Sequence, residues 1–178
     1  GIGGVLEYGA ALAVDASGDV LLTDIDGFGA RLIKVTPSGT ATELISNTQS
    51  IGAGAMLGVA NGVAADAQGN IFIGDVEASD SLGRIVELPY SAGSYGSPID
   101  YVPASTGALN YPNGLAIDSK GNLYVTDAYS DAENSGGAGG VIKIATQSTD
   151  FGSIAVGSSS ATYPLRFVFD PGGSLNGT

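Results

Sequence analysis

Carboxylate side chains gather at two points of the chain, in patterns that could hold a hard cation. The first is Asp24-Ile25-Asp26-Gly27, a D-x-D-G pattern typical of calcium loops, although the rest of an EF-hand pattern is missing. The second consists of Asp127, Asp131 and Glu133. Ca²⁺ takes about six to eight oxygen ligands, and acidic turns supply such oxygens. The sequence therefore indicates Asp24, Asp26, Asp127, Asp131 and Glu133 as candidate metal ligands and Ca²⁺ as the candidate cofactor.

Cysteine and histidine are both absent from the chain. Their absence removes thiolate nucleophiles, disulfides, the commonest general base and the commonest zinc ligand. Among enzymes, only a cation-dependent hydrolase that works through carboxylates stays open. We therefore expect a chain that binds or scaffolds, with a calcium-dependent, lactonase-like hydrolase as the alternative.

The charge of the chain restricts its partners. Six basic residues stand against 18 acidic ones, which gives a net charge of −12. Such a field repels phosphate backbones and anionic membrane surfaces. The longest uncharged apolar stretch, residues 51–65, is interrupted by glycines and too short to span a bilayer. We expect neither nucleic-acid binding nor membrane insertion.

Four tyrosines flank an insertion in the middle of the chain: Tyr90, Tyr95, Tyr101 and Tyr111. Aromatic side chains in polar loops can stack on sugar rings, so a carbohydrate-binding surface module is a further alternative. Tyrosines in loops rich in glycine and serine more often serve ordinary packing and hydrogen bonding.

One motif occurs three times along the chain, and it predicts the elements that position these residues. Its first part covers residues 11–24, 62–75 and 114–127, and a third element follows each copy at residues 31–35, 84–88 and 140–144. The apolar runs are short, rich in β-branched residues and bounded by turn residues, which indicates strands. A fourth strand is expected around residues 40–45 and 98–102. The second strand is apolar on both faces, so its sheet should lie between neighbouring sheets.

The repeated pattern N-G-V/L-A-x-D-x-x-G-N-I/L-F/Y-V/I-x-D, followed by R-I-x-x-L, resembles the NHL repeat. Residues 61–88 and 113–144 match it closely, and residues 10–35 match with Ala10 in place of Asn. The resemblance implies an all-β fold of β-propeller blades: three NHL-type four-stranded repeats in an incomplete ring. The blades are expected at about residues 9–46, 61–103 and 113–147, within a propeller segment of residues 1–147. The small residues at 11–15, 62–66 and 114–118 suit the crowded centre of a propeller.

Residues 148–178 fall outside the repeat. They resemble the first strands of an Ig-like β-sandwich module of the kind that follows such repeats in bacterial surface proteins. A last propeller strand over residues 151–156 is the alternative. The tail, together with the acidic, cysteine-free composition, implies a bacterial, exported protein in an extracellular or cell-surface location.

Residues that recur in every blade are expected to serve the blade itself. We assign structural roles to Asp15, Asp66 and Asp118, which begin hairpin turns, and to Arg31 and Arg84, which should pair with neighbouring carboxylates. Asp24, Asp75 and Asp127 also recur, so capping of loop N–H groups is their alternative to cation binding.

Loops that follow strands two and four of each blade emerge on one face. That face should carry most of the acids, Asp24, Asp75 and Asp127 included, and the binding surface. The partner, a protein or a carbohydrate, is not identified by the sequence. Three blades do not close a ring, so we expect self-association or a longer parent chain to complete the propeller.

Overall fold

The computed structural model describes residues 6–51, 56–78, 81–128 and 139–144. The chain divides into two compact units, Gly1–Thr146 and Gln147–Thr178. The expected Ig-like strands and their alternative, a propeller strand at 151–156, lie outside the described residues. No helix among the described residues is long and apolar enough to cross a membrane.

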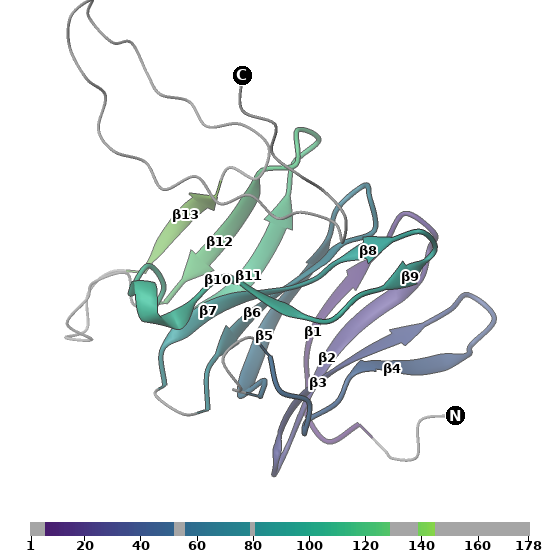
Figure 1. Cartoon of the computed structure of the whole chain (residues 1–178), viewed down its shortest axis with the longest axis horizontal. Helices are drawn as coiled ribbons and strands as arrows, with labels where there is room; N and C mark the ends of the chain where they lie inside the picture. The colour runs from purple at the N-terminus through teal and green to yellow at the C-terminus, as the bar shows by residue number, and fades with distance from the viewer. Residues whose placement is uncertain (1–5, 52–55, 79–80, 129–138, 145–178) are drawn as a thin grey trace, which may run out of the picture. The chain divides into compact units, whose positions relative to one another are not determined.

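The first unit is built from antiparallel sheets, which confirms the all-β prediction (Figure 1). The first sheet has the strand order β1-β2-β3-β4, so each strand pairs with the next along the chain. Its strands are β1 (Gly9–Val14), β2 (Val20–Asp26), β3 (Gly29–Val35) and β4 (Ala41–Ile45). The fourth strand lies where the sequence predicts it.

The second sheet repeats this arrangement with an insertion between its third and fourth strands. Its order is β5-β6-β7-β10, and a two-stranded hairpin, β8–β9, separates β7 from β10 in sequence. The strands are β5 (Val59–Ala65), β6 (Ile71–Val76), β7 (Gly83–Leu88), β8 (Tyr90–Ser91), β9 (Ser94–Tyr95) and β10 (Ile99–Val102), followed by the 3-10 turn η1 (Ala104–Thr106).

The third sheet has three strands in the part of the chain that the structure describes. They are β11 (Pro112–Ile117), β12 (Leu123–Asp127) and β13 (Gly140–Ile144), in that order. A fourth strand of this sheet, expected before residue 147, falls outside the described residues. The three sheets correspond in order and pairing to the blades of a β-propeller.

The turn between the first and second strands has the same structure in every sheet. In the second sheet, Asp66 Oδ1 accepts hydrogen bonds from the backbone N–H groups of Gln68, at 2.9 Å, and Asn70, at 2.8 Å. Gly69 adopts a φ of 93°, which glycine accepts without a steric penalty. Asp15 and Asp118 accept the equivalent pairs of bonds in their sheets. These bonds are those that the D-x-x-G pattern predicts.

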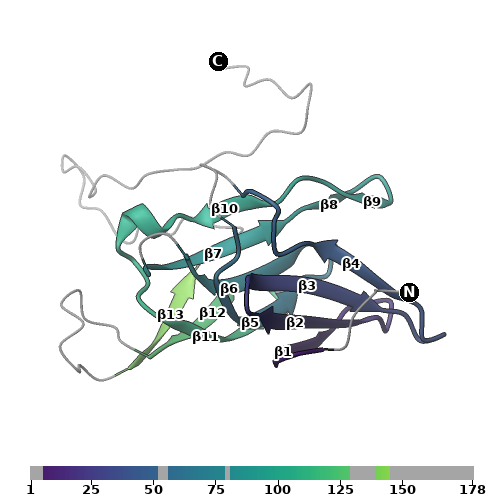
Figure 2. The ribbon, with the colours of Figure 1, turned by 90° about the horizontal axis from the view of Figure 1, so that it is seen from below.

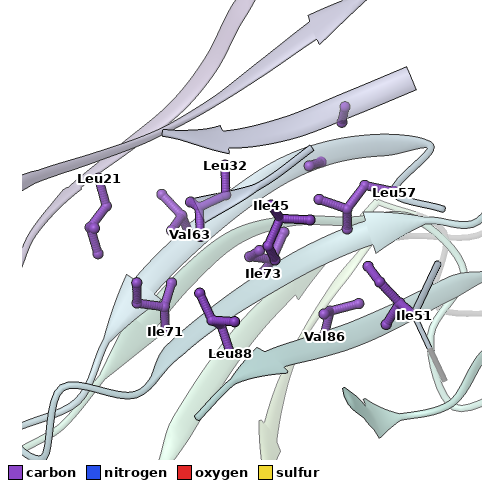
Figure 3. Packing of buried hydrophobic residues seen from close by; sticks show 12 residues of the cluster. Leu21, Leu32, Ile45, Ile51, Leu57, Val63, Ile71, Ile73, Val86 and Leu88 are labelled. Atoms are coloured by element: carbon purple, nitrogen blue, oxygen red, sulfur yellow. The ribbon is translucent and has the colours of Figure 1, made fainter. Parts of the chain in front are cut away.

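Alternating side chains of the second sheet face opposite neighbours. Ile71 and Ile73 pack in a core with residues of the first sheet, such as Leu21 and Leu32, whereas Phe72 packs in a second core with Leu123 and other residues of the third sheet. Figure 3 shows the first of these cores. Strand β6 is buried along its whole length, as its two apolar faces predict.

The first strands of the three sheets lie next to one another. Strands β1 and β11 both pack against β5, and Figure 2 shows the three along one side, with β4 and β10 toward the other. A Cβ atom on Gly62 would fall on the Asn113 carbonyl oxygen and the Leu115 side chain. The small residues of these strands therefore permit a close approach, as expected for the innermost strands of a propeller.

The first sheet exposes the apolar side chains of β1 on the face opposite the core, whereas Leu22 and Ile33 on the same face are buried. Leu12 and Val14, on that side of β1, are 73% and 67% exposed. A cavity of about 320 Å³ is lined by Leu6, Leu12 and Leu22, among other residues. Apolar sheet faces of this kind are usually covered by another layer.

Candidate functional site: the loop face and the hairpin cavity

The three repeated carboxylates expected in loops lie instead at the ends of strands. Asp24, Asp75 and Asp127 belong to β2, β6 and β12, and all three are buried. Each strand continues through its aspartate because that residue still pairs with the third strand, as Asp24 does with Arg31 and Asp75 with Arg84. The prediction that these acids lie in the loops after the second strands was therefore wrong.

These buried carboxylates hold the chain where it enters each blade. Asp24 Oδ1 accepts hydrogen bonds from the backbone N–H groups of Glu7, at 3.1 Å, and Tyr8, at 2.9 Å. Asp127 binds the N–H groups of Asn110 and Tyr111, each at 2.7 Å. Asp75 binds the N–H groups of Gly58, at 2.9 Å, and Val59. Because the same sequence separation recurs, the aspartate at the end of strand two clamps the connection that leads into strand one.

Two of the three clamps also carry an arginine. Arg31 binds Asp24 Oδ2 through Nε, at 3.0 Å, and Nη2, at 2.7 Å, and this hydrogen bonding raises the pKa of Arg31. Arg84, 1% exposed, places Nε 2.8 Å from Asp75 Oδ2. Burial raises the pKa of the Asp75 carboxyl, and Arg84 opposes that rise. In the third sheet Gly140 pairs with Asp127 at the corresponding position.

The first candidate cation cluster is engaged in hydrogen bonds within the protein. Asp26 Oδ1 accepts the N–H groups of Phe28, at 2.8 Å, and Gly29, at 3.1 Å, while Oδ2 accepts the Asn47 amide at 2.6 Å. The bond from Phe28 is the main cause of the lowered pKa of Asp26. In residues 6–51, 56–78, 81–128 and 139–144, no three acidic side chains converge in a way suited to a metal ion.

The second candidate cluster cannot be assembled from the described residues. Asp127 is placed as above, whereas Asp131 and Glu133 lie outside the described part of the chain. The expectation of a cation at this cluster stays a prediction.

The four tyrosines do not form a single shelf. Tyr101 packs edge-on against Phe72, with ring centroids 5.3 Å apart, and the backbone of Tyr111 binds Asp127. Tyr90 and Tyr95 face each other across the β8–β9 hairpin, with ring centroids 4.9 Å apart. Tyr90 and Tyr95 both line a cavity between the first two sheets.

The face formed by the loops after strands two and four exposes apolar side chains. Phe28, in the turn between β2 and β3, is 83% exposed, and Met56 and Leu82 are partly exposed in neighbouring connections. The bond between Asn47 and Asp26 joins two of these loops. Sequence reasoning missed Phe28 because a single aromatic residue in a turn belongs to no repeated pattern.

A small cavity lies at the opposite end of the blades, between the first two sheets. It has a volume of about 140 Å³ and is lined by the turn of residues 15–19, the turn of residues 67–69, Lys34, Tyr90 and Tyr95. Lys34 Nζ lies 2.9 Å from Asp19 Oδ2 and 5.7 Å from the centroid of the Tyr95 ring. The bond to Asp19 raises the pKa of Lys34, and burial raises the pKa of Tyr95.

Comparison with known proteins gives one family match. The family model of the NHL repeat matches residues 109–134, which lie in the third repeat. No curated protein matches the chain. The match and the antiparallel sheets together support a β-propeller of the kind used as an interaction or scaffold module. In its third repeat the chain is similar to the NHL repeat, and its fold is that of propeller blades.

Proposed function

We propose that this chain is a non-catalytic binding or structural scaffold module that works outside the cytoplasm. Its blades present the loops after strands two and four to a partner protein. The observation that carries the proposal is the exposed apolar set on this face, Phe28, Met56 and Leu82. Exposed aromatic and methionine side chains at loop tips are typical of protein-binding surfaces.

The internal use of the repeated acids supports a scaffold more than a hydrolase. Asp24, Asp75 and Asp127 each bind backbone N–H groups of the entering chain. A calcium-dependent hydrolase would need several carboxylate oxygens open to the cation and the substrate. In a scaffold, these carboxylate oxygens stabilise the blades. The loops that follow the second strands are then held on a rigid support.

The domain arrangement and location belong to the same proposal. Residues 1–147 form the propeller segment, with blades at about 9–46, 61–103 and 113–147, and residues 148–178 begin an Ig-like module. The low lysine and arginine content, the absence of cysteine and the resemblance of the tail support an exported bacterial protein.

Completion of the propeller is also part of the proposal. The exposed apolar face of the first sheet, with Leu12 and Val14, suits a further blade from a longer chain or from a second copy. Burying such a face stabilises by about 25 cal/mol per Å² of apolar surface, so a few hundred Å² outweigh a moderate cost of association.

Site-specific photocrosslinking in the native cells tests the loop face. A photoreactive phenylalanine analogue replaces Phe28, and a matched control places it at Ser38, which is exposed in the turn between β3 and β4 at the opposite end. We expect a discrete protein adduct from position 28 and none from position 38. Adducts of equal yield from both positions, or none from position 28, would overturn the proposal. Calcium-dependent hydrolysis of lactones by the purified chain would favour the enzyme instead.

A further inference from the structure

The cavity between the first two blades lies at the end of the blades opposite the loops that follow strands two and four. One wall is the turn of the first blade, another is the turn of the second, and Tyr90 and Tyr95 of the β8–β9 hairpin line the side. The hairpin is an insertion of the second blade, so the wall that it forms is not part of the repeated unit. An inference drawn from it is independent of the partner proposed for the opposite face.

The aromatic wall is fixed by contacts with the neighbouring turn. The backbone N–H of Tyr90 donates to Asn70 Oδ1 at 2.8 Å. Gly69 lies beneath the Tyr90 ring, where a Cβ atom would come within 2.9 Å of Tyr90 Cδ1. The rings of Tyr90 and Tyr95 are inclined by 58° to each other, which gives the cavity an aromatic corner.

The polar wall departs from the repeat at one residue. In the second and third blades, Asn70 and Asn122 donate side-chain amides to Oδ2 of the turn aspartate, each at 2.8 Å. In the first blade the corresponding residue is Asp19, which pairs with Lys34 instead. Among the described residues, Asp15 Oδ2 therefore lacks the donor that its two counterparts have. Both Asp15 and Asp19 line the cavity.

The cavity is lined by charges of both signs, the Lys34 ammonium and the Asp15 and Asp19 carboxylates, and Lys34 pairs with Asp19. This pairing makes Lys34 and Asp19 compensate each other, so the lining offers hydrogen-bond donors and acceptors side by side. A ligand with adjacent hydroxyl groups satisfies both, because a hydroxyl donates to Asp15 and accepts from Lys34. The tyrosine rings supply flat apolar walls for the C–H face of such a ligand. The volume of about 140 Å³ lies below the range of about 300 Å³ and more typical of drug-sized pockets.

We propose that this cavity binds one neutral sugar ring. The ring lies in the corner formed by Tyr90 and Tyr95, with its hydroxyl groups between Asp15 and Lys34. The site is small, and we expect binding in the millimolar range for a monosaccharide.

The test is an NMR titration of the full chain with three probes that differ in charge. Methyl glucopyranoside is the neutral sugar, butylammonium the cation and butyrate the anion. We expect saturable shifts of the amide signals of residues 16–19, 67–69 and 95 with the glycoside only. No saturable shift with methyl glucopyranoside, methyl galactopyranoside or methyl N-acetylglucosaminide would overturn the proposal, as would tighter binding of either ion.

Two variants test the assigned residues. Asp19→Asn restores the residue found in the other two blades and supplies Asp15 Oδ2 with an amide, so we expect at least tenfold weaker binding. The matched control, Asn122→Asp, makes the reverse change in a blade without the cavity and should leave affinity unchanged. Ala67→Leu fills the cavity from an exposed turn position and should abolish binding. Wild-type affinity in a folded Asp19→Asn or Ala67→Leu protein would contradict the assignment.

Discussion

The buried ion pair of the second blade gives the sharpest test of how the repeat stabilises the fold. Arg84 binds Asp75 Oδ2 through Nε, the Met56 carbonyl through Nη2, at 2.7 Å, and Asp100 Oδ1 through Nη1, at 3.2 Å. It therefore joins three separate segments of the blade. Arg84→Met keeps a side chain of comparable length and removes every one of these bonds.

The size of the effect follows from the burial of Asp75. Removing one partner of a buried ion pair costs about 3–5 kcal/mol, because the other charge is left without compensation. Asp75 can avoid this cost by taking up a proton. For a carboxyl with an ordinary pKa of about 3.9, protonation at pH 7 costs about 4 kcal/mol, which sets an upper limit on the charge penalty. We therefore expect Arg84→Met to lower the free energy of unfolding by about 3–4 kcal/mol.

The pH dependence has a definite sign. In Arg84→Met the folded-state pKa of Asp75 lies above its unfolded value, so the folded state binds the proton more tightly. The stability of the variant relative to wild type should rise as the pH falls from 7 toward about 5. Urea unfolding followed by tyrosine fluorescence measures this, since the chain lacks tryptophan.

Two further variants separate charge from packing. Asp75→Asn in the Arg84→Met background removes the buried charge and should recover about half of the loss. Arg31→Met is the matched control, because the Arg31 side chain is more exposed than that of Arg84, and water can screen Asp24 after its removal. A loss below about 1 kcal/mol for Arg84→Met, or a loss that does not change with pH, would refute the reasoning.

Three other predictions follow from the structure. Gly62→Ala should lower the free energy of unfolding by about 1–3 kcal/mol in chemical denaturation, because its Cβ meets neighbouring backbone, whereas Gly114→Ala at the equivalent position meets only the Thr126 side chain and should cost less. The side-chain bond from Asn122 is the main cause that lowers the pKa of Asp118 to about 2, so the difference in urea midpoint between wild type and Asp118→Asn should be constant above about pH 5 and shrink as the pH falls from there toward about 2. The purified chain should self-associate at micromolar concentration in light scattering, and Leu12→Glu should reduce its mass without unfolding it; a monomeric wild type would contradict this.

The parts of the fold set by local sequence were predictable. The D-x-x-G turns place their own hydrogen bonds within five residues, so Asp66 and its counterparts were assigned from the pattern alone. The position of β6 between two sheets followed from its two apolar faces. The fourth strands of the first two sheets were also placed correctly, at β4 and β10.

The candidate sites depend on contacts that a pattern does not contain. Asp24 was expected in a loop because its hydrogen-bond partners, Glu7 and Tyr8, lie 17 and 16 residues away. The hairpin cavity depends on how an insertion of the second blade packs against the turn of the first. Its sequence signals were Tyr90 and Tyr95, considered for stacking on a sugar, and Asp19, which stands where the other copies carry asparagine. The importance of Asp19 is visible only in the structure, where Lys34 pairs with it and lies over the Tyr95 ring.

The central claim is that the repeated carboxylates at the ends of the second strands clamp the blades and leave the chain to act as a scaffold. Carbon-13 NMR of the aspartate carboxyl groups during a calcium titration tests it most directly. The account predicts that the signals of Asp24, Asp75 and Asp127 stay unchanged up to millimolar Ca²⁺, because backbone N–H groups already occupy their oxygens. Saturable calcium-dependent shifts of these signals, with a matching rise in the thermal midpoint, would contradict the claim and favour a cation site.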